Sequence, residues 1–380
     1  MCLVSFACYI EPRYQLFNIE KKKGERVRIL ITGGAGFIGS HLTEAYLQEG
    51  HDVYVLDNLS TGSLENLRHL QDNSKFSNHL FFTEGSILDT SVLLELVGTC
   101  DFVVHLAAAV GVEYILANPL ASIITNVRGT ENVLEMCAKF KKKVLIASTS
   151  EVYGKHEHAP LREGDDCVYG SSDKCRWSYA AGKLMDEFTS LAYFRTHGLP
   201  VMIVRLFNTV GPRQTGRYGM VIPRFVRQAL SEAPITVFGD GNQSRTFTHV
   251  QDVVIALMKL LKTPAAVGEV INIGGFEEIS IKDLALRIKT LTHSRSEIKL
   301  IPYSDAYSRD YEDMQRRVPS TEKLSGLIGH TPSLELDAIL QDVIRYFEKK
   351  STNISQDNNN DISFSFSTPS DHSGEVEHSA

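Results

Sequence analysis

Residues 27–40 read VRILITGGAGFIGS, an apolar run that leads straight into a glycine-rich turn. Short apolar runs of this kind are typical of buried parallel strands, and we expect residues 40–50 to form the following helix. Gly33, Gly36 and Gly39 allow the backbone to turn tightly, to approach a pyrophosphate, and to pack the helix against the strand. The N-terminus of that helix would then receive the phosphate charge. The stretch therefore predicts a dinucleotide-binding unit.

A second apolar run, residues 53–57, ends in Asp57, about 20 residues beyond the glycines. A carboxylate at this place accepts a hydrogen bond from the 2′-hydroxyl of an adenosine ribose and repels a 2′-phosphate, so NAD is favoured over NADP. The alternative is that Asp57 only caps a helix or a turn. We expect further cofactor contacts around this turn and at later strand ends, from Phe37, Ile38, Asn58, Thr61, Gly62, Ser86, Ile87, Leu106 and Ala108.

Strand-like apolar runs continue to alternate with helical patterns along the chain. Residues 102–106, 144–147 and 201–206 read as buried strands, and residues 119–139 and 178–197 read as helices. Such alternation indicates an α/β fold with a doubly wound parallel (Rossmann) sheet. The looser pattern that follows indicates a smaller C-terminal α/β lobe that binds the substrate. We expect four parts: an N-terminal extension (1–25), an NAD-binding Rossmann domain with the catalytic residues (26–207), a substrate-binding lobe interleaved with the sheet (208–349), and a disordered tail (350–380).

Two further motifs carry candidate catalytic residues: STSEVYG at 148–154, and YAAGK, which supplies Tyr179 and Lys183. A tyrosine phenol has an unperturbed pKa of about 10, too high for a base at neutral pH. Lys183 lies one helical turn after Tyr179, so its charge should lower that pKa. Thr149 or Ser150 would hydrogen-bond the same substrate hydroxyl. The alternative is an ordinary amphipathic helix, but the hydroxyl-rich strand end and the glycine motif favour a catalytic pair.

The composition limits the classes of function. The chain has 380 residues, 43% of them hydrophobic and 22% charged, which is ordinary for a soluble globular enzyme. A formal net charge of -7 provides no electrostatic footprint for nucleic acid or an anionic membrane, so we expect neither as a partner. The 6 cysteines are scattered, without the spacing of a metal site or a disulfide framework. With no signal peptide or membrane-spanning run expected, we predict a cytoplasmic location and no metal.

The C-terminal half supplies candidate substrate ligands, namely Asn208, Arg217 and Arg245. Guanidinium groups suit phosphate and carboxylate recognition because they bind planar anions through two hydrogen bonds. For Arg217, a solvated surface charge is an equally good alternative. From Ser351 onward, Ser, Asn and Asp dominate and hydrophobic periodicity vanishes, which is why we expect the tail to be disordered.

Taken in order, these motifs resemble the extended short-chain dehydrogenase/reductase superfamily, and specifically its nucleotide-sugar branch. The resemblance implies a Rossmann fold, NAD, a UDP-sugar substrate, and a homodimer in which the helices at 119–139 and 178–197 form an intersubunit four-helix arrangement. It covers roughly residues 27–347. The matching stretches are GGAGFIGSHL (33–42), HLAA (105–108), STSEVYG (148–154), YAAGK (179–183), RLFNTVGPR (205–213), FGDGNQSRTFTHV (238–250) and RRVPS (316–320).

Within that branch the chain is most similar to UDP-glucuronate decarboxylases, which carry the TSEVYG stretch and a basic RxP stretch near the C-terminus. The resemblance assigns Glu151 and Arg317 to decarboxylation and reprotonation. Dehydratases usually place an acidic residue where this chain has Ser150, and epimerases commonly lack the glutamate. The expected reaction is C4 oxidation of UDP-glucuronate followed by decarboxylation, to UDP-xylose or its 4-keto form.

Two departures from the decarboxylase pattern leave the sugar open. Ile124 stands where these enzymes often carry a substrate-contacting lysine, and residues 166–177 differ from the usual loop. A UDP-hexose 4-epimerase, or a 4,6-dehydratase, of the same fold is therefore an alternative. A protein that uses the fold only to hold NAD is another, but the intact Tyr179 and Lys183 argue against it.

Overall fold

The computed structural model describes residues 25–360 apart from 157, 217–219, 307–311 and 313. Its centre is a parallel sheet in the order β11-β6-β5-β4-β1-β2-β3. The inner strands are buried on both faces, which explains their near-continuous apolar sequences. The predicted doubly wound sheet is confirmed. Its strands are β1 (Arg28–Thr32), β2 (Asp52–Asp57), β3 (Leu80–Glu84), β4 (Phe102–His105), β5 (Lys143–Thr149), β6 (Val201–Leu206) and β11 (Val270–Ile273).

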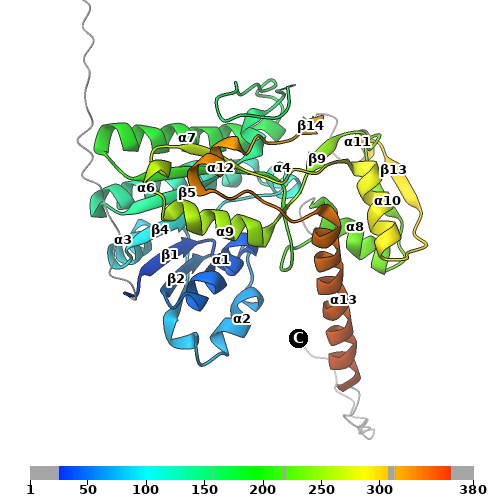
Figure 1. Ribbon diagram of the computed structural model, residues 1–380, viewed down its shortest axis with the longest axis horizontal. Coiled ribbons are helices and arrows are strands. Elements are labelled where there is room, and N and C mark those ends of the chain that lie inside the picture. Colours follow the sequence, from blue (N-terminus) through cyan, green and yellow to red (C-terminus); the bar gives the residue numbers. More distant parts are fainter. Residues whose placement is uncertain (1–24, 157, 217–219, 307–311, 313, 361–380) are drawn as a thin grey trace, which may run out of the picture.

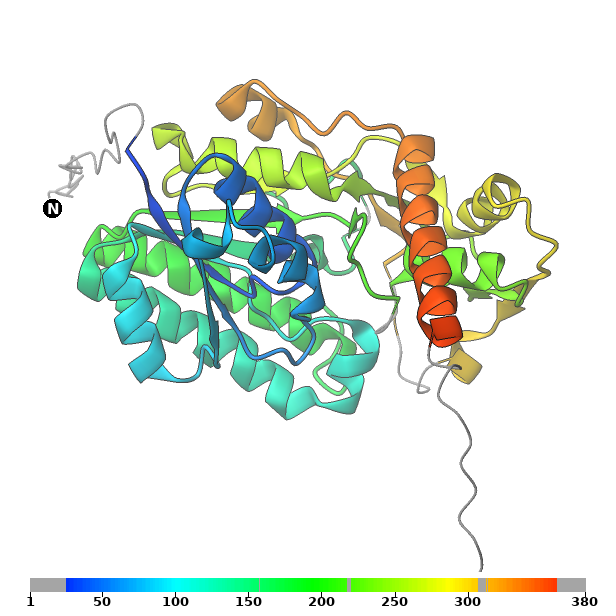
Figure 2. The ribbon, with the colours of Figure 1, turned by 90° about the horizontal axis from the view of Figure 1, so that it is seen from below.

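Helices cover both faces of this sheet (Figures 1 and 2). One hydrophobic core packs its first face against α1 (Phe37–Gln48), α2 (Glu65–Gln71), α9 (Val250–Leu261) and α12 (Glu322–Ile328). A second core packs the other face against α3 (Thr90–Thr99), α6 (Gly129–Phe140) and α7 (Arg176–His197). The strand order reverses between β1 and β4, and in such sheets ligands bind at the carboxyl ends of the strands beside that point.

The C-terminal elements form a smaller lobe at one end of the sheet, on the right of Figure 1. Its core joins α8 (Val221–Leu230), β8 (Ile235–Phe238), α10 (Ile281–Leu291) and α13 (Leu336–Asn360), and β8 pairs with β13 (Ile298–Ile301). Short pairings connect this lobe to the sheet domain. They involve β7 (Thr209–Val210), β9 (Ser244–Thr246), β10 (Thr248–His249), β12 (Glu278–Ser280) and β14 (Arg316–Arg317).

The helix predicted at 119–139 is interrupted by a wider turn. It consists of α5 (Pro119–Ile123), a π-helical segment η2 (Ile124–Arg128), and α6. Wide turns of this kind are frequent at functional sites because they re-aim side chains. Here the buried Asn126 side chain accepts a hydrogen bond from Ala109 N at 2.7 Å and donates one to Ala109 O at 3.1 Å. Asn126 thereby fixes the loop that follows β4.

The C-terminal boundary differs from the sequence prediction. Helix α13 continues to Asn360, so residues 350–360 are helical where the sequence indicated the start of a disordered tail. Residues 361–380, and 1–24 of the predicted extension, lie outside the described residues. The remaining short elements are η1 (Ser77–His79), α4 (Val112–Ala117), η3 (Ser150–Tyr153), η4 (Pro264–Ala266) and α11 (Tyr303–Ala306). Across the described residues, no helix combines the length and apolar character needed to cross a bilayer.

Candidate active site

A cavity of about 1610 Å³ lies at the carboxyl ends of β1, β2, β4, β5 and β6 and continues into the C-terminal lobe. Pockets for a single small ligand usually measure about 300–1,000 Å³, so this one has room for two nucleotides. Most of the residues proposed from sequence line it. They are Gly33, Gly36, Phe37, Ile38, Gly39, Asp57, Asn58, Thr61, Gly62, Ile87, Leu106, Ala108, Thr149, Ser150, Glu151, Tyr179, Lys183, Asn208, Arg245 and Arg317.

Two of the proposed residues are not placed in the cavity. Ser86 lies in the turn after β3, where its hydroxyl accepts a hydrogen bond from Leu88 N at 3.1 Å, and it is not among the described lining residues. It acts as a local turn residue, a role that serine often takes. Arg217 lies outside the described residues, so its assignment stays a prediction.

The glycine turn has the shape that a pyrophosphate requires. Gly33 has a φ of 73°, and a Cβ there would lie 2.8 Å from Ala107 N. A Cβ on Gly39 would lie 2.1 Å from Gly33 O, so only glycine permits this approach of helix to turn. Gly36 precedes the first residue of α1, and the helix N-terminus faces the cavity. These backbone features suit the phosphates of a dinucleotide.

Asp57 ends β2 directly beside this turn. Its carboxylate accepts hydrogen bonds from Ala35 N at 3.0 Å and from Leu59 N at 2.9 Å. A Cβ on Gly62 would lie 2.9 Å from both carboxylate oxygens, so the backbone passes close on the other side. Burial raises the pKa of Asp57 above its ordinary value, although its backbone donors act in the opposite direction. Asp57 is therefore held in place by the backbone at the wall of the cavity, where it also orders the turn.

Tyr179 and Lys183 lie one turn apart on α7, and the hydroxyl of Thr149 is near enough to the Tyr179 phenol to act on its pKa, in the lowering direction. The pKa of Tyr179 is raised, first by burial and then by the negative charges of Glu151 and Asp186. The sequence predicted a lowered pKa because Lys183 is near. The difference arises first because the phenol is buried, and Lys183 is in addition paired with the Asp186 carboxylate at 2.7 Å.

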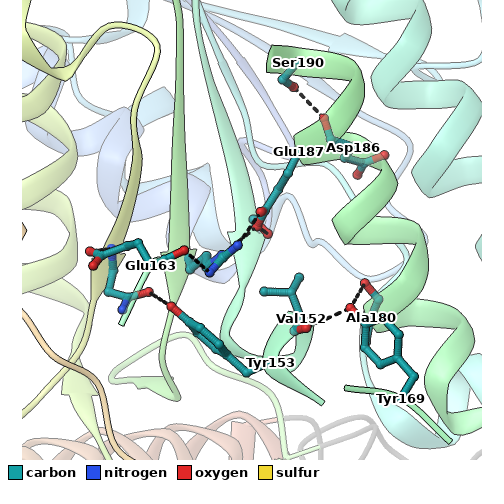
Figure 3. A network of polar contacts seen from close by, with 11 residues as sticks. Val152, Tyr153, Glu163, Tyr169, Ala180, Asp186, Glu187 and Ser190 are labelled. Carbon is teal, nitrogen blue, oxygen red and sulfur yellow. Dashed lines mark hydrogen bonds and ion pairs between the residues drawn. The ribbon is translucent and has the colours of Figure 1, made fainter. Parts of the chain in front are cut away.

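A buried polar network supports the strand end that carries Thr149. Ser148 Oγ donates to Glu187 Oε1 at 2.5 Å, and Glu187 receives two hydrogen bonds from Arg205 on β6, at 3.0 and 2.7 Å. Figure 3 shows Glu187 reaching from α7 toward this strand, with Tyr153 and Glu163 below it. Tyr153 donates to Asn272 Oδ1 at 2.8 Å, and the Arg205 guanidinium lies 4.7 Å from the centre of its ring. The network fixes the strand end relative to the catalytic helix.

Glu151 sits at the centre of an arginine cluster. Arg176 forms a short ion pair with one carboxylate oxygen, and Arg317 lies 3.5 Å from the other. With Arg245 also near, the three positive charges hold the pKa of Glu151 down to about 2 despite its burial. Glu151 is consequently ionised, and the cluster keeps an excess of positive charge beside Tyr179. The sequence placed Glu151 and Arg317 here but gave no partner for either.

Sequence reasoning missed several lining residues. Arg176 precedes Tyr179 by three positions, so the helical period alone could have placed it one turn before the phenol. Phe238 also lines the cavity, and the Arg224 guanidinium lies 3.9 Å from the centre of its ring. Gln243 and Tyr303 line the same end and share a hydrogen bond of 3.1 Å. These come from distant segments of the C-terminal lobe, and no local motif marks them.

A Rossmann sheet, a glycine turn with a carboxylate beside it, and a Tyr/Lys pair near the same strand ends are the features of an NAD-dependent enzyme that acts on alcohol or ketone groups. The chain belongs to the family described as GDP-mannose 4,6 dehydratase, whose profile matches residues 30–343. Among the described residues, no group of three potential metal ligands occurs.

Several characterised relatives are decarboxylases. The chain is 42% identical to the UDP-N-acetyl-α-D-glucosaminuronate decarboxylase of Bacillus cytotoxicus over 85% of its length and 98% of that protein. It is 35% identical to the UDP-glucuronic acid decarboxylase 1 of Danio rerio, over 86% of this chain and 74% of that protein.

Solved structures with the same fold extend the comparison to other reactions. The UDP-glucuronic acid 4-epimerase of Bacillus cereus, in complex with UDP-glucuronic acid and NAD, matches with a TM-score of 0.76 and 30% identity, covering 85% of this chain and 99% of that one. The dTDP-glucose 4,6-dehydratase of Bacillus anthracis, in complex with NAD, matches with a TM-score of 0.74 and 28% identity, covering 85% and 97%. The cofactor of this enzyme is NAD, as the sequence predicted.

Proposed function

We propose that this enzyme oxidises C4 of a UDP-hexuronic acid and then removes its C5 carboxylate as carbon dioxide. The observation that carries the proposal is the arginine cluster around Glu151. Arg176 and Arg317 are buried beside the catalytic tyrosine, and their positive charge exceeds that of the single carboxylate between them. A cavity of this kind favours a substrate with an anionic group at the reacting end of the sugar.

Several residues of the site contribute to the first step, the oxidation at C4. Bound NAD supplies the acceptor for the hydride that leaves C4. Tyr179 takes the proton of the C4 hydroxyl, and the hydroxyls of Thr149 and Ser150 hold that oxygen in position. Both hydroxyl-bearing residues line the cavity together with Tyr179, which supports this arrangement.

Decarboxylation follows from the position of the new ketone. A 4-ketone is β to the carboxylate on C5, so the bond between C5 and the carboxyl carbon breaks and its electron pair passes to the C4 oxygen. Tyr179, now protonated, donates a hydrogen bond to that enolate oxygen. Arg317 balances the developing negative charge or organises the proton donor for C5. Protonation at C5 yields the 4-keto pentose, and return of the hydride yields UDP-xylose.

The substituent at C2 of the sugar distinguishes two substrates of this class. UDP-glucuronate carries a hydroxyl there, and the relative from Bacillus cytotoxicus is named for the N-acetylated sugar. In this chain Ile124 occupies the place where the resemblance leads us to expect a substrate-contacting lysine, and it is not among the described lining residues. UDP-glucuronate is our first choice, and its C2-acetamido analogue is the substrate to compare it with.

Epimerisation at C4 is the second candidate, because the solved UDP-glucuronic acid 4-epimerase shares the fold. Both reactions begin with the same oxidation and differ in the fate of the carboxylate. The test is to incubate the purified protein and NAD with UDP-glucuronate, its C2-acetamido analogue, UDP-glucose and UDP-N-acetylglucosamine, and to analyse the products by mass and by proton NMR, which reports the configuration at C4. We expect a product lighter by one carbon dioxide from at least one uronate. A product of unchanged mass with inverted C4 would replace decarboxylation by epimerisation.

We also propose that the enzyme is a cytoplasmic homodimer. Leu120 and Ile123 on α5, with Met185 and Phe188 on the adjacent α7, are apolar and exposed. Exposed apolar groups that gather on neighbouring helices commonly mark a protein interface. The resemblance noted from sequence places these helices in an intersubunit four-helix arrangement, which supports the dimer.

A further inference from the structure

The Lys183 ammonium has a buried partner that the proposed mechanism does not use. Asp186 follows it by three positions on α7, and its Oδ2 lies 2.7 Å from Lys183 Nζ. Lys183 is 2% exposed and Asp186 is 1% exposed. Tyr179 precedes Lys183 by one helical turn, so the ammonium is placed between the phenol and the carboxylate along one helix.

Groups from three other elements extend this pair into a buried polar row. His105 at the end of β4 shares a hydrogen bond of 2.7 Å with Thr32 Oγ1 on β1 and one of 3.1 Å with Thr130 Oγ1 on α6. Thr130 also lies near Asp186 and acts to lower the pKa of that carboxyl, against the larger effect of burial, which raises it. Burial lowers the pKa of His105 to about 3, so His105 is neutral and contributes no charge to the row.

Stability does not explain the pair. Burying an ammonium and a carboxylate removes both from water, and their attraction repays that loss only in part, so well-packed apolar residues often stabilise a protein equally well. The position of the pair, one helical turn after Tyr179, indicates its role instead. An ammonium that faces a carboxylate presents less net positive charge to the phenol than an ammonium alone.

We propose that Asp186 is a positioning residue, whose carboxylate fixes the Lys183 ammonium beside Tyr179 and offsets its charge. The inference rests on the role of Tyr179 as the base in the proposed function. The Asp186 carboxylate holds the Lys183 ammonium in one orientation before any ligand binds. Through its charge, Asp186 also influences how easily Tyr179 loses its proton.

Other charged or polar neighbours also shift the pKa of Tyr179. Glu151 from η3 raises the pKa of Tyr179, whereas Thr149 from β5 and Arg176 from α7 lower it. Asp186 raises it as well. Removal of the Asp186 charge therefore lowers the pKa of Tyr179, and the active, deprotonated base forms at lower pH.

The test compares Asp186→Asn, which removes the charge and keeps the shape, with Asp186→Glu, which keeps the charge. The first measurement is the pH dependence of kcat/KM of the holoenzyme on the uronate that is turned over. We expect the acid limb of Asp186→Asn to move to lower pH by about one unit or less, because a nearby negative charge disfavours the phenolate. Asp186→Glu should keep the acid limb near its wild-type position. Should Asp186→Asn not fold, Asp186→Ser makes the same change in charge and leaves space for a water.

Ser190→Ala is the matched control, because Ser190 Oγ donates to the backbone oxygen of Asp186 at 2.7 Å and does not contact Lys183. It should keep the wild-type profile. An Asp186→Asn profile that overlays the wild-type one, or whose acid limb moves to higher pH, overturns the inference. The same holds if activity falls with no change in the profile, because a merely structural residue would behave in that way.

A second measurement needs no substrate. Phenolate absorbance is titrated in the wild type and in Asp186→Asn, each with Tyr179→Phe subtracted, so that only Tyr179 contributes. We expect its phenolate to form at lower pH in Asp186→Asn. If no uronate is decarboxylated but this shift appears, the proposed function fails and the role of Asp186 stands. If carbon dioxide is released and the shift is absent, the role of Asp186 fails alone.

Discussion

Tyr179 is the residue on which the proposed oxidation depends most directly. Tyr179→Phe removes the proton acceptor and keeps the ring that packs in the site. Loss of a general base usually lowers turnover by about 10²–10⁴-fold, so we expect a decrease of that size with NAD binding and thermal stability retained. Tyr169→Phe is the control, because Tyr169 donates to the Val152 backbone at 2.8 Å and is not among the described lining residues. Near-normal turnover in Tyr179→Phe would assign the base elsewhere, first to Glu151.

Glu151 and Arg317 distinguish decarboxylation from simple oxidation. Oxidation at C4 needs NAD, Tyr179, Lys183 and a hydroxyl, whereas carbon dioxide loss also requires control of charge at C5. We expect Glu151→Ala and Arg317→Ala to abolish carbon dioxide release from UDP-glucuronate, with NAD affinity unchanged. Release of labelled carbon dioxide from the carboxyl-labelled substrate measures this.

Because the Glu151 side chain is only 16% exposed and lies between two guanidiniums, its removal is expected to destabilise the fold, by at most about 3–5 kcal/mol. Glu151→Gln, which keeps hydrogen bonding, is therefore the companion variant. Arg316→Ala is the control for Arg317→Ala: Arg316 is exposed and pairs with Glu278 at 2.7 Å. Retained carbon dioxide release in the Glu151 and Arg317 variants would contradict their assignment.

Among single residues, the sequence predicted those that belong to motifs of short spacing. Gly33, Gly36, Gly39 and the Tyr179/Lys183 pair could be found because each motif is local: the glycines follow a strand, and Tyr179 and Lys183 are one turn apart on a helix. Asp186 was missed although it lies three positions after Lys183, because a carboxylate on a helix is ordinarily solvated and burial is not visible in one sequence. Burial, which the sequence does not show, also explains why the pKa of Tyr179 is raised and not lowered.

Among the elements, the β1–α1 turn and the end of β2 together select the cofactor. Asp57→Ala removes the carboxylate that faces the ribose, and a hydrogen bond to a charged group contributes about 1.5–3 kcal/mol. We expect NAD affinity to fall by about tenfold or more, and the preference for NAD over NADP to be lost. Titration calorimetry with both cofactors checks this. Glu84→Ala is the control. Glu84 on β3 lies opposite Asp57 in the register of the two strands, and it is not among the described lining residues. Equal or tighter NADP binding by the wild type would contradict the prediction.

The end of β4 makes the fold sensitive to acid. The pKa of buried His105 falls from its ordinary value to about 3, so the unfolded chain binds a proton before the folded protein does. Stability is therefore lost as pH falls below about 6.5 and down to the folded pKa. From about pH 7.5 to about pH 5, we expect His105 to account for a loss of about 2 kcal/mol in the free energy of unfolding.

Urea unfolding at the two pH values measures that loss. In His105→Asn, whose amide can bond Thr32 and Thr130 without titrating, the loss should be smaller by about 2 kcal/mol. His293→Asn is the control, because His293 is exposed and its φ of 52° suits asparagine. An unchanged pH dependence in His105→Asn would show that His105 does not set it.

The elements of the Rossmann sheet were predictable because apolar strands alternate regularly with helices. The π-helical turn Ile124–Arg128 was not, since it depends on the contact between Asn126 and the loop after β4. Residues such as Phe238 and Tyr303 meet in the cavity only after the C-terminal lobe has folded. Long-range pairings of this kind, including the entry of β11 into the sheet, leave no local periodic signal.

For the whole molecule, the proposed dimer needs an apolar surface that a second copy can cover. The described chain exposes Leu120 by 68%, Ile123 by 41%, Met185 by 51% and Phe188 by 61%, all on α5 and α7. These helices pack against each other, so the four side chains belong to one face, on the side of the sheet opposite α1 and α9. Burial of apolar area at about 25 cal/mol per Å² favours association of two such faces.

Phe188→Glu tests this interface, because a carboxylate that must enter an apolar interface is strongly disfavoured. We expect the wild type to sediment as a dimer at micromolar concentration and Phe188→Glu to sediment as a monomer. Phe276→Glu is the matched control: Phe276 is 60% exposed but follows β11, away from α5 and α7, so this variant should stay dimeric. A monomeric wild type would remove the dimer from the proposal, and a dimeric Phe188→Glu would move the interface to another face. In either case we expect the NAD site to bind its cofactor, because Gly33, Asp57 and Tyr179 of one chain line the same cavity.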